Sequence, residues 1–505
     1  MDTKALRQKI LDLAIRGKLV PQDPNDEPAS VLLERIRVEK QQMVKEGKLK
    51  PKDIKNDTII FVGEDNLHYE KFQDGSVKCI EDEIPFEVPE GWAWCRLKHV
   101  CTMAAGKAKP TDQIMTEPFE GCYPCFGGNG IRGYVDEYNQ DGIFSIVGRQ
   151  GALCGNINIA KGKFYATEHA VVTTLFSGID FNWSNYVLEA LQLNSYATGA
   201  AQPGLSVANV LNVFAPVPPT QEQVHIGIRI AESIKIIENI EDEKENLQTL
   251  ISSAKSKILD LAIRGKLVPQ NSNDEPASVL LERIRAEKEE LIKAGKIKRD
   301  KKESIIFKGD DNSYYQQTGT LIENINDWNL DDIPINWELC CLGEICDYGN
   351  CVNVDTKDID EGAWVLDLED IEKDSGKVIH KIRKYERDSS STKHLFKKGQ
   401  VLYSKLRPYL NKVVLADEEG FCTSEILPLN FSNVVEPQYA LYYLMSPTFL
   451  KYANRCSYGV KMPRLGTADG RKAVFPLPPF EEQRRISQHI SKIFIEIDNI
   501  SNMLL

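Results

Sequence analysis

Residues 10–22 read ILDLAIRGKLVPQ, and residues 258–270 read the same thirteen letters. A second identical block, NDEPASVLLERIR, occupies residues 25–37 and again residues 273–285. Both blocks therefore recur at the same offset, and this indicates an internal repeat whose unit is about half of the 505-residue chain. A repeat of this length contains a whole domain and a connector, so the sequence predicts two similar units in one polypeptide.

Each copy of the repeat predicts a helical hairpin. In the second copy, residues 252–264 are the end of a helix that stops at Gly265, a residue type suited to the left-handed conformation that follows a helix. A polar turn comes next, and Pro276 stands in the first turn of a helix that ends near Gly295. In the first copy we expect helices over 3–16 and 28–46, with apolar faces formed by Leu6, Ile10 and Leu13 and by Leu32, Leu33, Ile36 and Met43.

Composition places the chain among ordinary globular proteins, with 42% hydrophobic and 27% charged residues. It contains no run of 18 apolar residues, and its first residues carry charges throughout, so we expect a cytoplasmic protein without a membrane span or secretory signal. Twelve scattered cysteines fit reduced thiols. Cys122 and Cys125 form the single CxxC pair, which makes a zinc or redox site a minor alternative. The net charge of −12 means that any nucleic-acid surface must be local.

Two globular segments follow the hairpins, at about 92–215 and 337–475, and their sequences differ between related borders. Short apolar runs and frequent glycines predict mixed α and β structure in both. In the first segment strands are expected at 143–147 and 170–175, and in the second at 401–403, 413–415 and 426–429.

The stretch 220–264 carries the longest helical pattern, about 45 residues or a rod on the order of 65 Å. Apolar residues at heptad spacing predict a coiled coil, with polar breaks at Ser233 and Lys244. Its two core positions are expected to be filled by Ile230, Ile237, Ile251 and Ile258 and by Ile226, Ile240, Leu247, Ala254 and Leu261.

The partner of this helix is expected within the same chain. PVPPTQEQ at 216–223 resembles PLPPFEEQ at 476–483, so the C-terminal helix corresponds to the first half of the central helix, and the helix at 3–16 to its second half. This predicts a circularly arranged, pseudo-two-fold repeat in which Met1 and Leu505 lie side by side and the composite helix runs antiparallel to the central one. The C-terminal helix carries Ile486, Ile490, Ile493, Ile497, Ile500 and Leu504. The alternative is that these helices dimerise between molecules.

Two different domains held at a fixed separation suit DNA, where modules read half-sites at defined spacing. The sequence as a whole resembles the DNA-specificity subunit of type I restriction-modification systems. The likeness covers essentially the whole chain. It is carried by the two repeated blocks and the two proline-rich exits, by GGNGIRGY, VGRQGALCGNI and ATEHAVV in the first domain, and by WVLDLEDIEKDSGK, VLYSKLRPYLNKV and CTSEILPL in the second.

The resemblance implies an α+β chain with two α/β target-recognition domains separated by a long antiparallel coiled coil. It implies no catalytic site and no cofactor in this chain, and assembly on double-stranded DNA with two modification subunits that methylate adenine using S-adenosylmethionine. A restriction subunit that uses ATP and Mg²⁺ joins that core. The hairpin copy ahead of the first recognition domain departs from the family's usual layout and makes this one permuted.

The predicted layout has five parts. Residues 1–50 form the N-terminal helical spacer half, and 51–219 form target-recognition domain 1. Residues 220–298 form the central coiled-coil helix and the second hairpin, and 299–479 form target-recognition domain 2. Residues 480–505 form the C-terminal coiled-coil helix that pairs with the N-terminal helix.

Charged residues and residues that can form hydrogen bonds to bases are the candidates for DNA binding. Residues 373–412 contain twelve basic and three acidic residues, a net charge of +9 that suits phosphate contacts. Arginine can bond guanine, and Asn or Gln adenine, through two hydrogen bonds. The candidates in the second domain are Arg383, Lys393, Lys405, Arg407, Tyr409, Lys461 and Arg464, and those in the first are Lys107, Lys109, Asn129, Arg132, Arg149, Gln150, Lys161 and Lys163.

Several of these basic residues and their neighbours also have purely structural explanations. A single lysine in the basic stretch is nearly as well explained as part of a solvated surface, and His169 in an apolar run suits a core histidine. Gly127, Gly128 and Gly130 suit a tight turn, although missing side chains would also let the backbone approach DNA closely.

Two other classes of function remain open from the residues. A stand-alone DNA-binding regulator would show the same modules without needing modification subunits. An enzyme that methylates or cleaves DNA would need its own motifs, yet no Walker loop, HExxH or paired zinc cluster occurs in the sequence, and GGNGIRG lacks the GxGxxG context.

Overall fold

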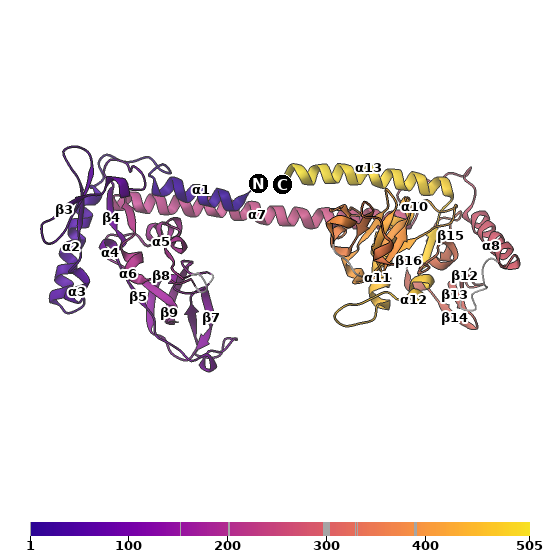
Figure 1. Ribbon diagram of the computed structural model, residues 1–505, viewed down its shortest axis with the longest axis horizontal. Helices are drawn as coiled ribbons and strands as arrows, with labels where there is room; N and C mark the ends of the chain where they lie inside the picture. Colours follow the sequence, from indigo (N-terminus) through magenta and orange to yellow (C-terminus); the bar gives the residue numbers. More distant parts are fainter. Residues whose placement is uncertain are drawn as a thin grey trace. The chain divides into compact units, whose positions relative to one another are not determined.

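The computed structural model describes residues 2–151, 153–199, 203–295, 303–328, 330, 332–387 and 391–504. It divides into two compact units, Met1–Glu243 and Lys244–Leu505, and the long helix α7 (Thr220–Ile263) contributes to both. Figure 1 labels the elements of each unit. Within the described part of the chain, no helix has the length and hydropathy needed to cross a membrane.

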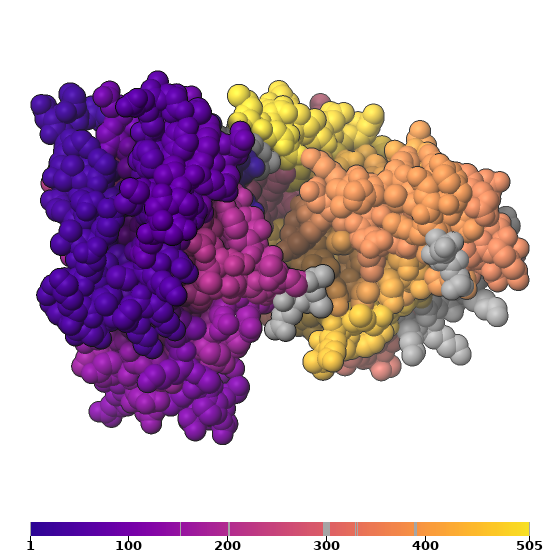
Figure 2. Space-filling view, turned by 60° about the vertical axis from the view of Figure 1, so that its left-hand side comes forward, coloured from indigo at the N-terminus to yellow at the C-terminus, as the bar shows by residue number. Residues whose placement is uncertain are grey.

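Unit 1 begins with the predicted hairpin, formed by α1 (Thr3–Ile15) and α2 (Ala29–Lys45). A short helix, α3 (Pro51–Ile54), leads into a small antiparallel sheet of β1 (Ile59–Val62), β2 (His68–Lys71) and β3 (Val77–Cys79). Figure 2 shows this N-terminal segment as indigo atoms on the surface of the unit. Leu32 and Ile36 of α2 are buried as expected, which fixes the hairpin to the unit.

The larger sheet of unit 1 has six strands in the order β5-β10-β8-β9-β6-β7, antiparallel except for the β6–β9 pair. The helices α5 (Phe181–Ala190) and α6 (Val207–Leu211) follow it, and β4 (Ala93–Arg96) pairs with β11 (Phe214–Val217) next to α4 (Leu97–Val100). Both strands predicted in this segment are confirmed. The six strands are β5 (Cys101–Ala105), β6 (Tyr123–Gly127), β7 (Gly130–Val135), β8 (Gln140–Gly148), β9 (Ile157–Ala166) and β10 (Ala170–Leu175).

Unit 2 starts with the end of α7, then α8 (Ala277–Lys293) and a second small sheet of β12 (Ser304–Lys308), β13 (Tyr314–Thr318) and β14 (Leu321–Asn324). Next, β15 (Glu338–Cys341) pairs with β24 (Val474–Leu477), beside α9 (Leu342–Ile345). This order of hairpin, small sheet and strand pair repeats that of unit 1.

The recognition segment of unit 2 contains two sheets, in the orders β16-β19-β22-β17-β18 and β21-β20-β23. The strands predicted at 401–403, 413–415 and 426–429 are confirmed as β20, β21 and β23. The strands are β16 (Val352–Val354), β17 (Trp364–Leu366), β18 (Ile382–Arg383), β19 (Lys393–Phe396), β20 (Val401–Ser404), β21 (Val413–Leu415), β22 (Gly420–Thr423) and β23 (Ile426–Leu429). The helices are α10 (Pro437–Met445), α11 (Pro447–Cys456), α12 (Thr467–Lys472) and α13 (Phe480–Leu504).

One helix pair in each unit runs antiparallel. In unit 1, Arg7 of α1 lies 3.6 Å from Glu238 of α7, whereas Gln22, beyond the end of α1, donates to Glu222 near the start of α7. In unit 2, Lys255 of α7 pairs with Asp498 of α13, and Gln270 donates to Glu482 at the start of α13. The predicted meeting of Met1 and Leu505 lies outside the described residues.

The buried face of α1 differs from the predicted one. Leu11, Ala14 and Ile15 are buried, whereas Leu6 is 37% exposed and Ile10 and Leu13 are half-buried. The same shift occurs in the second copy, where the buried residues are Leu259, Ala262 and Ile263.

The heptad assignment along α7 holds for Ile226, Ile230 and Ile237, which are buried. It fails at Ala254, which is exposed, while its neighbour Lys255 turns inward to Asp498. A straight α-helix has 3.6 residues per turn, whereas a heptad pattern repeats every 3.5 residues. Residues at heptad spacing therefore move gradually around the helix and leave its buried face within a few heptads. The wrong assignment at Ala254 follows from this drift, whereas the 13-residue helix α1 is too short for drift to move its buried face.

The two recognition segments share a backbone framework despite their different sequences. Ala170 pairs with Gly148 in unit 1, and Ile426 pairs with Ser404 in unit 2, with both partners displaced by 256 residues. The backbone N–H of Asp180 donates to Gln223 at 2.8 Å, and that of Glu436 donates to Gln483 at the same distance. Equivalent positions in the two units can therefore be compared residue by residue.

Candidate nucleic-acid interface

Two loops in unit 1 are held side by side by backbone hydrogen bonds. Residues 149–151 follow the end of β8, and residues 203–205 precede α6. The N–H of Leu205 donates to the carbonyl of Arg149 at 2.8 Å, and the N–H of Gly151 donates to that of Pro203 at 3.0 Å. We call these segments the paired loops of unit 1.

Glycine turns bring other candidates to the same place. A Cβ on Gly148 would lie 2.0 Å from the carbonyl oxygen of Gly128, and a Cβ on Gly128 would lie 3.3 Å from that of Gln150. The N–H of Arg149 donates to the carbonyl of His169 at 2.9 Å. The glycines of the GGNG turn thus permit close backbone packing beside Asn129, whose amide accepts a hydrogen bond from Asn156 at 2.7 Å.

The remaining candidates of unit 1 lie elsewhere on it. Lys161 and Lys163 are exposed on β9, opposite Ile143 and Asp141 of β8. Lys109 is only 9% exposed and pairs with Glu137 at 2.9 Å. Lys107 is exposed, and Arg132 donates to Thr111 at 2.9 Å. Of the eight candidates, Asn129, Arg149 and Gln150 are grouped around the paired loops.

Unit 2 contains the equivalent paired loops, at residues 405–407 and 463–465. The N–H of Leu465 donates to the carbonyl of Lys405 at 3.0 Å, and the N–H of Arg407 donates to that of Pro463 at 2.7 Å. These bonds repeat the pattern of unit 1. The structure here brings together the candidates Lys405, Arg407, Tyr409, Lys461 and Arg464.

Arg464 is held by an acidic partner. Its guanidinium makes three contacts of 2.8–3.1 Å with the carboxylate of Glu425. The hydrogen bonds from Arg464 lower the pKa of Glu425, so this carboxylate stays ionised. Arg464 therefore fastens its loop to the turn between β22 and β23, and its charge is largely used within the protein.

Arg407 sits in a strained position. Its φ of +49° belongs to the left-handed region that side-chain-bearing residues seldom adopt, and Pro408 follows it. Its buried Nε has no hydrogen-bond partner among the described residues. Tyr409, two residues on, is 47% exposed. Strain and an unsatisfied donor at one residue are features typical of a functional position.

The basic stretch 373–412 is not the free positive surface that its composition suggested. Acidic residues from outside the stretch neutralise much of it: Lys381 and Arg383 bind Glu418, Lys384 binds Glu361, Arg387 binds Asp370, and Lys377 binds Asp498. Lys393 is 2% exposed and pairs with Asp367 at 2.9 Å, so its assignment as a DNA contact is wrong. Linear charge counting missed these acids because they come from loops and helical segments outside the stretch.

The CxxC pair is not joined by further potential metal ligands in the described part of the chain. Cys122 accepts the N–H of Phe119 at 3.3 Å, and Cys125 is buried in β6. Among the residues that the structure describes, no group of three or more His, Cys, Asp or Glu residues is arranged to hold a metal ion.

Comparison with known proteins identifies the family. The family model described as "Type I restriction modification DNA specificity domain" matches residues 89–249 and again residues 334–504. The chain belongs to this family. Each match begins just before β4 or β15, so the specificity domains exclude the small sheets; the first match ends within α7, and the second includes α13.

Curated relatives of this specificity-domain protein are themselves specificity subunits. It is 30% identical over 407 residues to the type I restriction enzyme EcoEI specificity subunit of Escherichia coli, covering 68% of this chain and 61% of the relative. It is 46% identical over 132 residues to the EcoprrI subunit of the same species, covering 26% of this chain and 33% of the relative. The EcoAI specificity subunit of Escherichia coli is 25% identical, and the match covers 97% of this chain and 88% of the relative. The chain thus spans one third and somewhat under two thirds of the first two relatives.

Solved structures of the same kind also align with the specificity-domain protein. The HsdS subunit from Thermoanaerobacter tengcongensis aligns with a TM-score of 0.40 at 15% identity, covering 83% of this chain and 92% of that one. A chain from a structural study of assembly and conformational transition in a type I R-M system aligns with a TM-score of 0.48 at 16% identity, covering 83% and 94%.

Reasoning from sequence missed two parts of this site. Glu425 was not a candidate because no local pattern links it to Arg464, which lies 39 residues away. The pairing of 203–205 with 149–151 was also missed. A short shared motif could have revealed it, since Gly199 and Pro203-Gly-Leu205 in unit 1 match Gly459 and Pro463-Arg-Leu465 in unit 2 at the same spacing.

Proposed function

We propose that this chain is the non-catalytic DNA-recognition subunit of a type I restriction-modification complex. It reads a split, asymmetric target with one recognition domain per half-site, and it positions modification subunits for adenine methylation. One observation carries the proposal: the family model matches twice, and the two matched regions share a backbone framework but carry different side chains on it. Similar frames with different side chains suit two half-sites of different sequence.

The spacing between half-sites is proposed to come from an antiparallel coiled coil with pseudo-two-fold symmetry. Helix α7 is the one continuous helix of this coiled coil, and α1 and α13 are its two partner helices in a circular arrangement. The antiparallel contacts of α1 within unit 1, and of α13 within unit 2, support this proposal. A monodisperse monomer in light scattering is expected for the isolated chain, and an obligate homodimer would contradict the intramolecular pairing.

The partners are proposed from the family. Two modification subunits, which bind S-adenosylmethionine, and restriction subunits, which use ATP and Mg²⁺, supply the chemistry, so this chain needs no cofactor of its own and works in the cytoplasm. Two copies of one hairpin sequence, residues 25–37 and 273–285, support a partner that binds twice. DNA contacts are proposed for the exposed or half-buried candidates, and Lys393 is left out because it is buried in an ion pair.

The decisive experiment is co-expression of the chain with its modification subunits, followed by methylation-sensitive long-read sequencing of the host DNA. The expected result is adenine methylation at a split asymmetric motif with a fixed gap, present only when both components are made. Methylation by the chain alone would instead assign it an enzymatic activity. Sequence-specific DNA binding without any methylation in the reconstituted complex would favour a stand-alone regulator.

A further inference from the structure

The paired loops occupy equivalent places in the two units. Besides the bonds between the loops, the N–H groups of Arg149 and Lys405 donate to His169 and Glu425, at 2.9 and 3.0 Å. Thr198 and Gly204 exchange two backbone hydrogen bonds of 2.9 Å, and Tyr458 and Arg464 do the same at 2.9 and 3.1 Å. The backbone of this site is therefore fixed by the same set of bonds in both units.

Pro203 and Leu205 recur as Pro463 and Leu465, whereas the other side chains of the paired loops differ between the units. Arg149 corresponds to Lys405, Gln150 to Leu406, Gly151 to Arg407, and Gly204 to Arg464. Gly151 and Arg407 both have positive φ, at +94° and +49°. An arginine is thus held in unit 2 at a conformation that glycine adopts without strain in unit 1. A constant frame with exchanged side chains is expected where each unit reads a different sequence.

The connection between α11 and α12 adds an exposed tip to unit 2, which Figure 1 shows as a loop extending from the unit. Val460 is fully exposed, Tyr458 is 63% exposed, and Met462 is 49% exposed, with Lys461 exposed between them. Arg464 closes the loop by binding Glu425. Apolar and cationic side chains on a braced loop suit a DNA groove, where cations meet phosphates and apolar groups meet base edges or base steps.

We propose that the paired loops form the sequence-reading surface of each unit, and that Arg407 is a specificity-determining residue of the half-site read by unit 2. Arg407 contacts a base edge, Lys461 contacts the adjoining backbone or base edge, and Glu425 acts as a positioning residue through Arg464. In unit 1, Arg149 and Gln150 fill the equivalent role. This inference rests on the proposed function.

The test uses the complete complex with its modification subunits and maps methylated motifs by long-read sequencing. Arg407→Ala is expected to relax one base of the unit 2 half-site, raising methylation at sites altered there by about tenfold or more, since a two-bond contact discriminates by that order. The other half-site and the gap should stay unchanged. Gln150→Ala should relax only the unit 1 half-site.

Lys398→Ala is the matched control, because Lys398 is an exposed cation of the same stretch at the opposite end of β20 and should leave the motif unchanged. Lys461→Ala changes only an exposed residue at the tip of the loop, and it should relax the recognition of the same half-site. This second variant keeps the inference testable if the Arg407→Ala protein fails to assemble into the complex. An unchanged motif in both unit 2 variants would overturn the inference. The proposed function would then stand as long as the unaltered complex still methylates a split motif, and it would fail separately if that complex did not.

Discussion

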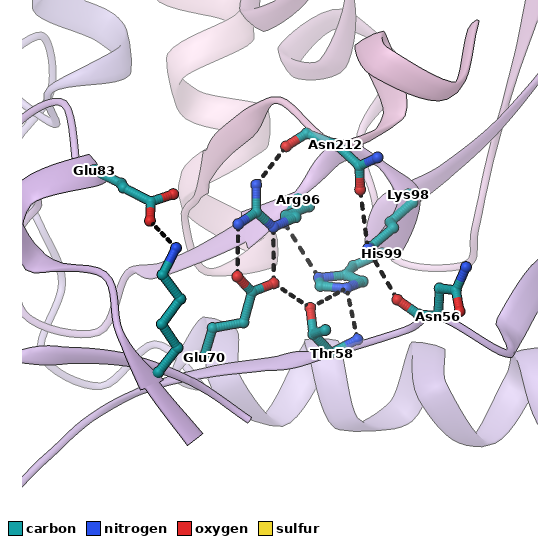
Figure 3. A network of polar contacts seen from close by, with 9 residues as sticks. Asn56, Thr58, Glu70, Glu83, Arg96, Lys98, His99 and Asn212 are labelled. Atoms are coloured by element: carbon teal, nitrogen blue, oxygen red, sulfur yellow. Dashed lines mark hydrogen bonds and ion pairs between the residues drawn. The ribbon is translucent and has the colours of Figure 1, made fainter. Parts of the chain in front are cut away.

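Units 1 and 2 attach the same hairpin and small sheet to their recognition segments by different chemistry. In unit 1, Glu70 of β2 accepts hydrogen bonds from Arg96 at 2.6 and 2.8 Å and from Thr58 at 2.5 Å (Figure 3). Arg96 also donates to the carbonyl of Asn212 at 2.7 Å. A buried ion pair thus joins the small sheet, β4 and the approach to β11.

In unit 2 the same positions carry Gln316, Cys341 and Ser304. Gln316 donates to the carbonyl of Lys472 at 2.7 Å, which is the equivalent of the Asn212 carbonyl in unit 1. It also donates to the sulfur of Cys341 at 3.1 Å. One neutral amide therefore replaces a whole ion pair. The fold requires a hydrogen-bond donor for the carbonyl of Asn212 or Lys472, and this donor need not be charged.

The largest expected effect comes from disturbing this pair in unit 1. Glu70→Gln leaves the guanidinium of Arg96, which is only 16% exposed, without its carboxylate. Removing one partner of a buried ion pair costs about 3 kcal/mol or more. Hydrogen–deuterium exchange of the full chain should show this loss in β2 and β4, with β13 and β15 unaffected.

The double variant Glu70→Gln with Arg96→Cys reproduces the residue pair of unit 2 and should recover most of the lost protection. Gln316→Glu is the converse control, because it places a carboxylate at a buried position that lacks the arginine present in unit 1. Equal losses in the single and double variants would show that the two networks are not interchangeable.

The second expected effect tests where the units are the same. Gly17 and Gly265 end the first helix of each hairpin at φ +64° and +66°, and a Cβ there would lie 2.3 Å from Pro89 and from Pro334. Alanine at either position combines backbone strain with overpacking, at a cost of about 2 kcal/mol. Hydrogen–deuterium exchange should show nearly equal losses of protection in α1 for Gly17→Ala and at the end of α7 for Gly265→Ala.

Gly47 and Gly295 provide matched controls, because both have positive φ but open space around the absent Cβ. Alanine there should cost only the strain, about 1 kcal/mol. A clear inequality between Gly17→Ala and Gly265→Ala would mean that identical sequence blocks are not packed alike.

These contrasts also mark what the sequence could reveal. The hairpins, α7 and many strands were predictable because identical blocks, glycine stops and apolar runs are local signals. The buried face of α1 was not, because Leu6 and Leu11 are both apolar and only the packing of α1 decides that Leu11 is buried and Leu6 is exposed. The charge of the basic stretch was misjudged because its acidic partners, such as Asp367 and Glu418, lie on other segments. The paired loops depend on backbone hydrogen bonds between distant segments, and their only local signal is the short motif shared by residues 203–205 and 463–465.

The third expected effect is a pH dependence of the site around α4 and β4 in unit 1. His99 of α4 accepts the N–H of Arg96 at 3.2 Å, and burial, with Lys40 and Lys98 nearby, lowers the pKa of His99 from 6.5 to about 3. Burial tends to raise the pKa of Glu70, but hydrogen bonds from Arg96 and Thr58 outweigh it and lower that pKa to about 2. Both groups bind protons more readily when unfolded, so stability falls with acidification, from pH 6.5 for His99 and from 4.5 for Glu70.

In unit 2, Glu344 takes the place of His99, accepting the N–H of Cys341 at 2.9 Å and a hydrogen bond from Arg285 at 2.8 Å. Protection of β4 should therefore fall relative to that of β15 between pH 6.5 and 4.5, by up to about 1.4 kcal/mol per pH unit, the limit for one proton. His99→Asn, which keeps an acceptor without a titrating ring, should flatten this slope. If the slope persisted in that variant above about pH 5.5, the acid sensitivity would have to arise from groups outside this network, because Glu70 contributes mainly below about that pH.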